Sequence, residues 1–241
     1  MSLRKLCFFT MLAMAVALAA LGRSHLPVQG LDLPALDSPP PHPAALLPVQ
    51  SRDVDNLGAG KLLVASRELG DPNFAKTVVL LLRYDEDGVL GLILNRRTHI
   101  PLSQALEGLQ AAKDRSDPIY LGGPVETSTV VALLRSPAKL EGAERIFSAV
   151  YWISSKTLFE QTISARPDPG VLRVYVGYAG WNREQLRREV KLGSWFIFPA
   201  DAQTVFNTDP DSMWPQMIRK TELTLARNQP AELTPCAAAL R

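Results

Sequence analysis

Two continuous apolar runs joined by an acidic turn constrain this chain more than any other feature. Val78 to Leu82 and Val89 to Leu94 contain no polar side chain. A run of this length without alternation is typical of a strand that is covered on both faces. The intervening Asp85-Glu86-Asp87-Gly88 supplies carboxylates that accept backbone hydrogen bonds and a glycine that tolerates positive φ. The pattern therefore predicts a β-hairpin with a short loop.

The other periodic segments alternate strands with helices. Ser154 or Ser155 is predicted to cap a helix that runs to about Ile163, and Pro167-Asp168-Pro169-Gly170 ends it. Leu102 to Gln110 is predicted as a second helix. Further strands are predicted at residues 61–65, 119–121, 130–134, 150–153, 171–176 and 195–198. The sequence thus predicts a mixed sheet with helices.

The clearest helix start follows a glycine-rich segment, Gly177 to Trp181. With Asn182 as the N-cap, Gln185 occupies the position from which its side chain can reach back to the cap amide, as in a capping box. Trp181 and Leu186 have the spacing of a hydrophobic staple. We expect a strand, a glycine-rich turn and then a helix. The free amides at such a helix start could bind an anion, but a stapled helix packed on the sheet is the simpler interpretation.

The N-terminal part differs in composition from the rest. Residues 1–22 carry Arg4 and Lys5, followed by an apolar run from Leu6 to Leu21 that only Thr10 interrupts. Such a run reaches about 24 Å as a helix, short of the roughly 30 Å hydrocarbon core, which is typical of a signal peptide. Export, for instance to the periplasm, is therefore expected. An uncleaved anchor, touching the membrane only through residues 6–21, and a misassigned start codon are the alternatives.

Residues 23–56 hold seven of the nineteen prolines, including Pro39-Pro40-Pro41. Proline lacks a backbone donor and has a fixed φ, so this segment is predicted as an extended linker. The globular domain is expected over residues 57–241.

Charge and residue counts exclude several chemistries. With 26 basic and 24 acidic residues the net charge is +2, whereas neutralising many phosphates requires a basic surplus, so nucleic acid is a disfavoured partner. Cys7 lies in the leader, which leaves Cys236 without a partner in an exported mature chain. His99 is the only histidine after residue 57, and no G-x-S-x-G, P-loop or dinucleotide fingerprint occurs. We therefore predict no cofactor and no metal site.

Four blocks resemble the YqgE/AlgH family, and they occur in order between residue 57 and about residue 220. They are Asp71-Pro72-Asn73-Phe74, Tyr84 to Gly88 with Gly91 to Arg96, Gly122-Gly123-Pro124-Val125, and Gly177 to Trp181 with Gln185-Leu186. The resemblance implies a single α+β domain, built on a mixed, bent β-sheet that folds towards a pseudo-barrel with helices packed outside. Proteins of this family are usually cytosolic, are often labelled transcriptional regulators, and have no agreed biochemical activity.

The chain departs from the family pattern in three places. Arg97 stands where the family often has proline, and Asn182-Arg183-Glu184 replaces a typical Gly-Pro-Gly. Residues 1–56 form a front extension that is foreign to the usual short cytosolic form. A cytoplasmic location, as is usual for the family, therefore stands as the alternative to export.

Candidate ligand-binding residues are the polar, glycine and aromatic positions within these blocks. They are Asp71, Asn73, Asn95, Arg96, Gly122, Gly123, Gly180 and Trp181. Asn95 and Arg96 follow a buried strand, where side chains emerge at a sheet end, and two adjacent glycines allow a ligand to approach backbone amides. The simpler interpretation places Asp71 and Asn73 in a turn and pairs Arg96 with Asp85 or Asp87.

Three functions are compatible with these residues. We rank first a non-catalytic ligand-binding or regulatory module, whose unknown small-molecule or protein ligand is anionic or peptide-like and binds between Asn95, Arg96 and the Gly122-Gly123 turn. The second is a hydrolase-type enzyme with Asp71 or Asp87 as the base and Arg96 as its electrostatic partner. The third is a transcriptional regulator, as the family label suggests. Its phosphate contacts would come from a stripe on one helix face, Arg183, Arg187 and Lys191.

Overall fold

The computed structural model describes residues 52–168 and 170–228, so the predicted leader and most of the predicted linker lie outside the described residues. Within the predicted linker, Val54–Asn56 form a short 3-10 helix, η1, in which the Asp53 carboxylate accepts a hydrogen bond from the Asp55 amide (3.0 Å). Val54 is buried in the core. The packed domain therefore includes residues before Leu57, the predicted start, because an apolar side chain of this segment is buried.

The predicted hairpin is confirmed. Strands β2 (Val78–Asp85) and β3 (Gly88–Ile93) pair antiparallel, with Asp85 opposite Gly88. The Asp85 carboxylate accepts a hydrogen bond from the Asp87 amide (3.0 Å), and Gly88 has φ +134°, so the turn uses the chemistry that its residues offer.

The hairpin belongs to a larger mixed sheet in which the strands follow the order β10-β1-β2-β3-β9-β6-β8-β7. The other strands are β1 (Lys61–Ala65), β4 (Arg97–Pro101), β5 (Pro118–Leu121), β6 (Val125–Arg135), β7 (Glu144–Phe147), β8 (Val150–Ile153), β9 (Leu172–Trp181) and β10 (Trp195–Pro199). Strand β5 pairs parallel with β9 and antiparallel with β4, while the other pairs are antiparallel.

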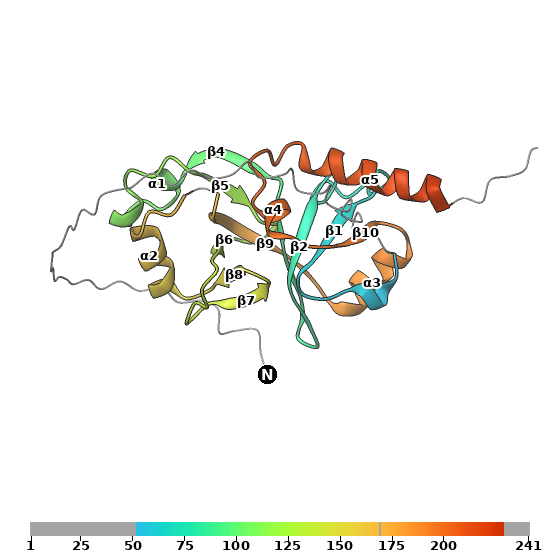
Figure 1. The fold of residues 1–241 in the computed structure, drawn as a ribbon, viewed down its shortest axis with the longest axis horizontal. Helices are drawn as coiled ribbons and strands as arrows, with labels where there is room; N and C mark the ends of the chain where they lie inside the picture. The colour runs from blue at the N-terminus through green and yellow to red at the C-terminus, as the bar shows by residue number, and fades with distance from the viewer. Residues whose placement is uncertain (1–51, 169, 229–241) are drawn as a thin grey trace, which may run out of the picture. The chain divides into compact units, whose positions relative to one another are not determined.

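Strand β9 pairs with three different strands, and the sheet curves around it. Its last residues pair with β3, whereas Tyr175 and Val176 pair with β5 and, on the other side, with β6. The sheet therefore curls into a half-barrel, with helices around it (Figure 1). The fold is α+β with a mixed, bent sheet, as the resemblance implied.

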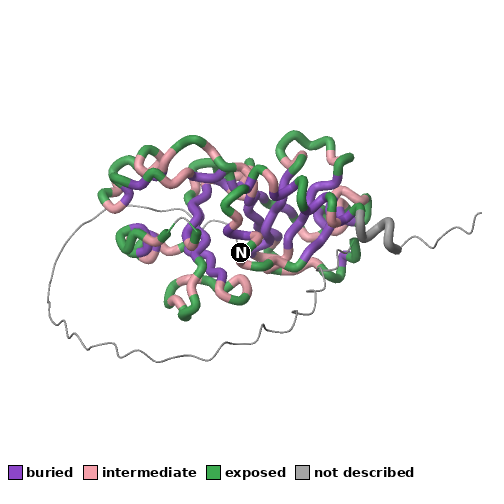
Figure 2. Tube along the Cα trace, turned by 45° about the horizontal axis from the view of Figure 1, so that its top comes forward, coloured by how far each residue is buried: buried purple, intermediate pink, exposed green. Residues whose placement is uncertain are grey.

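One expectation about β9 was wrong: Gly177 to Trp181 continue the strand rather than form a turn. The glycines here permit a close approach between two backbones, described below, which sequence inspection does not distinguish from a turn signal. Figure 2 shows the strands as mostly buried and the loops and outer helix faces as exposed.

Two predicted helix starts are confirmed in position. Helix α2 (Lys156–Ser164) has Ser155 as its N-cap, and α3 (Arg183–Lys191) has Asn182, whose side-chain oxygen accepts a hydrogen bond from the Gln185 amide (2.7 Å). The reciprocal half of the expected capping box does not form. The Gln185 side chain instead donates to Glu189 one turn later (2.9 Å).

The helix predicted at residues 102–110 is much shorter. Helix α1 covers only Leu102–Ala105, and a 3-10 turn, η2, follows at Gln110–Ala112. Gly108 lies between them with φ +93°, which ends a right-handed helix.

Two helices, α4 (Ala202–Val205) and α5 (Met213–Asn228), were not predicted. Helix α5 is attached to the sheet through Trp214, whose indole N–H donates to the Ala65 carbonyl (2.8 Å). None of the helices in the described part is long and apolar enough to cross a membrane.

Candidate functional site

The first motif block forms a tight turn before β2. The Asp71 carboxylate accepts a hydrogen bond from the Asn73 amide (2.8 Å), and its carbonyl accepts from the amides of Phe74 (2.9 Å) and Ala75 (2.8 Å). Asp71 and Asn73 remain exposed, while Phe74 is half-buried. Turn chemistry therefore explains the Asp71 carboxylate but leaves the Asn73 side chain at the surface.

Asn95 holds this turn against the hairpin. Its side-chain oxygen accepts a hydrogen bond from the Val78 amide (2.9 Å), and its side-chain nitrogen donates to the Lys76 carbonyl (2.9 Å). Lys76 has φ +56°, so the chain enters β2 through a left-handed residue that Asn95 supports. Asn95 consequently acts as a backbone clamp.

Arg96 lies over the same turn. One guanidinium nitrogen donates to the Pro72 carbonyl (3.1 Å), and the side chain is half-buried. Burial lowers the pKa of Arg96, and the negative charge of Asp71 acts in the opposite direction. The guanidinium is thus partly removed from water beside a single nearby carboxylate.

The alternative pairing of Arg96 with Asp85 or Asp87 was wrong. Both acids lie at the hairpin turn, whereas Arg96 follows the other end of β3, and Asp85 instead lies 3.5 Å from Arg83. The length of β2 separates the two ends by on the order of 20 Å. Asp87 is therefore not placed to act with Arg96, and of the two candidate bases only Asp71 lies near it.

Trp181 anchors the motif turn from the interior. The ring centroids of Phe74 and Trp181 lie 5.2 Å apart, and those of Phe74 and Trp195 lie 5.7 Å apart. The indole N–H groups of Trp181 and Trp195 both donate to one oxygen of Glu189, at 3.2 and 2.9 Å. Trp181 is buried, so its role in the structure is to hold the turn and α3 on the sheet.

Gly122 and Gly123 permit a close backbone approach, but the neighbour is this chain's own strand β9. A Cβ on Gly122 would lie 2.3 Å from the Gly177 carbonyl oxygen, and one on Gly123 would lie 2.2 Å from that of Tyr178. The Gly122 amide donates to the Val176 carbonyl (2.9 Å). The space that a ligand would need is therefore occupied by β9.

The structure thus unites only part of the predicted set. Asp71, Asn73, Asn95 and Arg96 meet at one end of the hairpin, and Trp181 reaches them through Phe74. Gly180 is exposed opposite Leu90 in the sheet, where an added Cβ would make only ordinary contacts, the nearest at 3.7 Å.

A second polar group was missed by sequence inspection. Arg173 lies inside β9 with only 4% of its surface exposed, donates to the Asn207 carbonyl and stands 4.9 Å from the Tyr120 ring centroid. Tyr175 is fully buried beside it, and burial raises the pKa of its hydroxyl while the charge of Arg173 opposes this. The available signal was a single charge within the apolar run Val171 to Val176.

Metal ligands do not gather in the described part of the chain, where no group of three or more His, Cys, Asp or Glu side chains could hold an ion.

These observations define a class: a single α+β domain with a curled mixed sheet, in which glycines let the segment between β5 and β6 approach β9. An Asp-Pro-Asn turn is clamped at the end of its β2–β3 hairpin. A family model described as AlgH-like matches residues 62–226, and the chain belongs to this family.

Relatives and solved structures agree with this assignment. The chain is 33% identical over 181 residues to a UPF0301 protein of Chlorobium limicola, covering 74% of this chain and 95% of the relative. It is 35% identical over 173 residues to a UPF0301 protein of Streptomyces avermitilis, covering 69% and 88%. The solution structure of the AlgH protein from Pseudomonas aeruginosa is similar, with a TM-score of 0.57 and 28% identity over 71% of this chain and 94% of that one.

Proposed function

We propose that this chain is a non-catalytic ligand-binding module, and that its ligand binds where Arg96 meets the turn of Asp71 and Asn73. One observation supports the proposal above the others. A half-buried guanidinium lies beside the exposed side chains of a different motif block. Because burial already disfavours the charge of Arg96, a new anionic partner would relieve a cost that the free protein carries.

The surroundings of Arg96 favour a singly charged, peptide-like ligand. A carboxylate pairs with the guanidinium. The exposed side-chain carboxamide of Asn73 can both donate a hydrogen bond to a peptide group and accept one from it. The Asp71 carboxylate acts on the same guanidinium and repels a multiply charged anion. A short peptide or its free C-terminus has this combination of one charge and neighbouring amides.

The test is a melting experiment with a panel of dipeptides and small dicarboxylates. A dipeptide should raise the melting temperature of the wild-type chain, and Arg96→Ala should abolish this rise without changing the circular dichroism spectrum. Arg97→Ala is the matched control, because the neighbouring arginine is exposed and paired with Asp211 (3.2 Å). Retention of the full shift in Arg96→Ala would contradict the proposal.

The regulator alternative has weaker support. Arg183 lies over the Tyr84 ring, 5.0 Å from its centroid, and Arg187 lies 3.6 Å from an Asp55 carboxylate oxygen. Two of the three cations in the expected stripe thus contact the domain itself, and the domain has no large basic surplus.

We also propose that the chain is exported. The support is the cationic start and the apolar run from Leu6 to Leu21, which have the order and length of a signal peptide.

A further inference from the structure

The interior of the half-barrel carries a buried cation that the fold leaves largely unpartnered. Arg173 is 4% exposed, and its Nε and Nη1 atoms have no hydrogen-bond partner among the described residues. Its described partners are the Asn207 carbonyl, to which Nη2 donates, and the Tyr175 hydroxyl, and neither bears a full charge while the tyrosine is protonated. Burying a guanidinium without a counter-charge is costly, so this position differs from an ordinary structural arginine.

Another buried arginine shows how the described part neutralises such a charge, even though its Nη1 atom also has no hydrogen-bond partner there. Arg115 is similarly buried, yet its guanidinium pairs with Asp117 and also donates to the Pro167 carbonyl (3.0 Å). No described carboxylate forms an ion pair with Arg173. The domain therefore neutralises one buried arginine and not the other.

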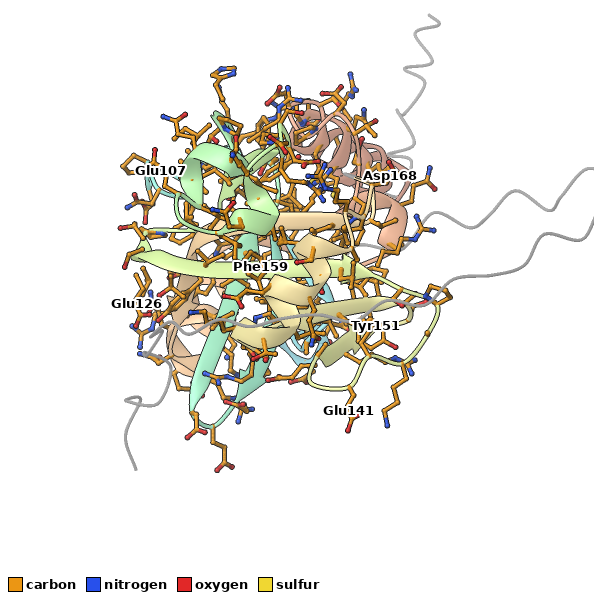
Figure 3. All side chains as sticks on the ribbon, turned by 90° about the vertical axis from the view of Figure 1, so that its left-hand side faces the viewer. Glu107, Glu126, Glu141, Tyr151, Phe159 and Asp168 are labelled. Atoms are coloured by element: carbon orange, nitrogen blue, oxygen red, sulfur yellow. The ribbon has the colours of Figure 1, made fainter. Side chains whose placement is uncertain are left out.

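The acids nearest in the chain to Asn207 are engaged elsewhere. Asp209 accepts a hydrogen bond from the Ser212 amide (3.4 Å), and Asp211 pairs with Arg97. Seen from the α2 side, three of the four labelled acids, Glu107, Glu126 and Glu141, lie at the periphery of the molecule (Figure 3), and the fourth, Asp168, is exposed. None of these groups supplies the missing charge.

The polar atoms on the same side of the sheet are mainly donors. Tyr175 follows Arg173 by two residues and so shares its face of β9, and the only described group that interacts with the buried Tyr175 hydroxyl through a side-chain hydrogen bond is Arg173 itself, which leaves the hydroxyl proton available to a ligand. Leu133 lies opposite both Arg173 and Trp152, which places Trp152 on this face as well. The Trp152 indole N–H is also buried and unpartnered in the described part. Guanidinium and indole groups only donate, so this interior is suited to an acceptor-only ligand.

We propose that the interior of the half-barrel is a carboxylate-binding site, with the Arg173 guanidinium and the Tyr175 hydroxyl as its donors. One guanidinium balances one negative charge, which favours a monocarboxylate over a phosphate dianion. The Tyr120 and Tyr175 rings, with centroids 5.4 Å apart, supply apolar surface for the rest of a small organic acid. A bound carboxylate would replace the Asn207 carbonyl, two residues after helix α4, as the partner of Arg173.

This site is separate from the one around Arg96, and variants distinguish the two. The purified full-length chain is melted in acetate, butyrate or phosphate, with chloride at equal ionic strength as the reference. Butyrate at about 100 times its Kd should raise the melting temperature by about 5–10 °C, from the linkage between binding and stability for a domain of this size. Arg173→Met should abolish the butyrate shift and leave the dipeptide shift that depends on Arg96 intact. Tyr175→Phe should weaken butyrate binding several-fold, and Arg97→Met, outside both proposed sites, should change neither shift.

A direct readout keeps the proposal testable if Arg173→Met does not fold. In the wild-type chain, titration with butyrate should shift the ¹⁵N and proton resonances of the Arg173 Nε–H group and saturate. Three results would overturn the proposal: no shift with any carboxylate, a response to phosphate alone, or a butyrate shift that survives in folded Arg173→Met.

Discussion

Replacing Asn95 by alanine tests whether this motif residue serves the fold. The substitution removes the acceptor for the Val78 amide and the donor for the Lys76 carbonyl. Val78 is fully buried, so its orphaned amide costs about 1–3 kcal/mol, and the exposed Lys76 carbonyl can turn to water at about 0.5–1 kcal/mol. The free energy of unfolding should therefore fall by about 1.5–4 kcal/mol.

The measurement is guanidinium denaturation followed by tryptophan fluorescence, with thermal melting as a second probe. The expected loss corresponds to a melting temperature lower by about 3–16 °C for a domain of this size. Asn73→Ala is the matched control, because its exposed side chain makes no hydrogen bond among the described contacts, and it should change stability by less than about 0.5 kcal/mol. If Asn95→Ala is as stable as Asn73→Ala, the clamp interpretation is refuted.

Three further predictions follow from other parts of the chain. Gly122→Ala should yield little folded protein by circular dichroism, because its Cβ would overlap the Gly177 carbonyl, whereas Gly180→Ala should fold normally. Burial holds the pKa of Tyr175 above its ordinary value near 10, so its contribution to stability is complete below pH 10 and is lost as pH rises further; Tyr175→Phe should flatten the alkaline end of a stability–pH profile. The small residues of Ala17-Leu18-Ala19 and Ala20-Leu21-Gly22 suit a signal peptidase, so mass spectrometry of the chain from its native host should find an N-terminus at Ala20 or Arg23. An intact Met1 form in the soluble fraction would contradict export.

The predictable part of the fold is the part whose chemistry is local. The hairpin of β2 and β3, the Ser155 cap and the Asn182 cap each depend on residues within a few positions of one another. Strands such as β4 and β7, which lack an apolar run, form because a neighbouring strand offers hydrogen bonds, and that neighbour is not visible in the sequence.

The same reasoning explains the error at Gly177 to Trp181. Glycine indicates a turn when only its backbone freedom is considered, but Gly177 of β9 lies against Gly123 and lets the segment between β5 and β6 approach the strand closely. The same limit applies to Arg173. The apolar run around it does not indicate whether this arginine pairs with an acid on a strand that is distant in the sequence. Whether Gly177 to Trp181 form a strand, and whether Arg173 meets an acid, both depend on how strands distant in the sequence pair with one another.

The contacts of the motif residues suggest where function should be sought. Asn95 binds the backbone at the start of β2, Trp181 contacts α3, and Gly122 allows β9 to approach. Many of the residues that carry the family resemblance therefore stabilise the half-barrel. Residues that serve the fold in this way have their hydrogen bonds satisfied in the free protein and gain little from a ligand. Arg96 and Arg173 differ, because each is at least partly buried and neither forms an ion pair within 4 Å among the described residues. An anionic partner would offset the free-energy cost of burying these guanidinium charges. The two arginines are therefore the most informative positions for ligand screening.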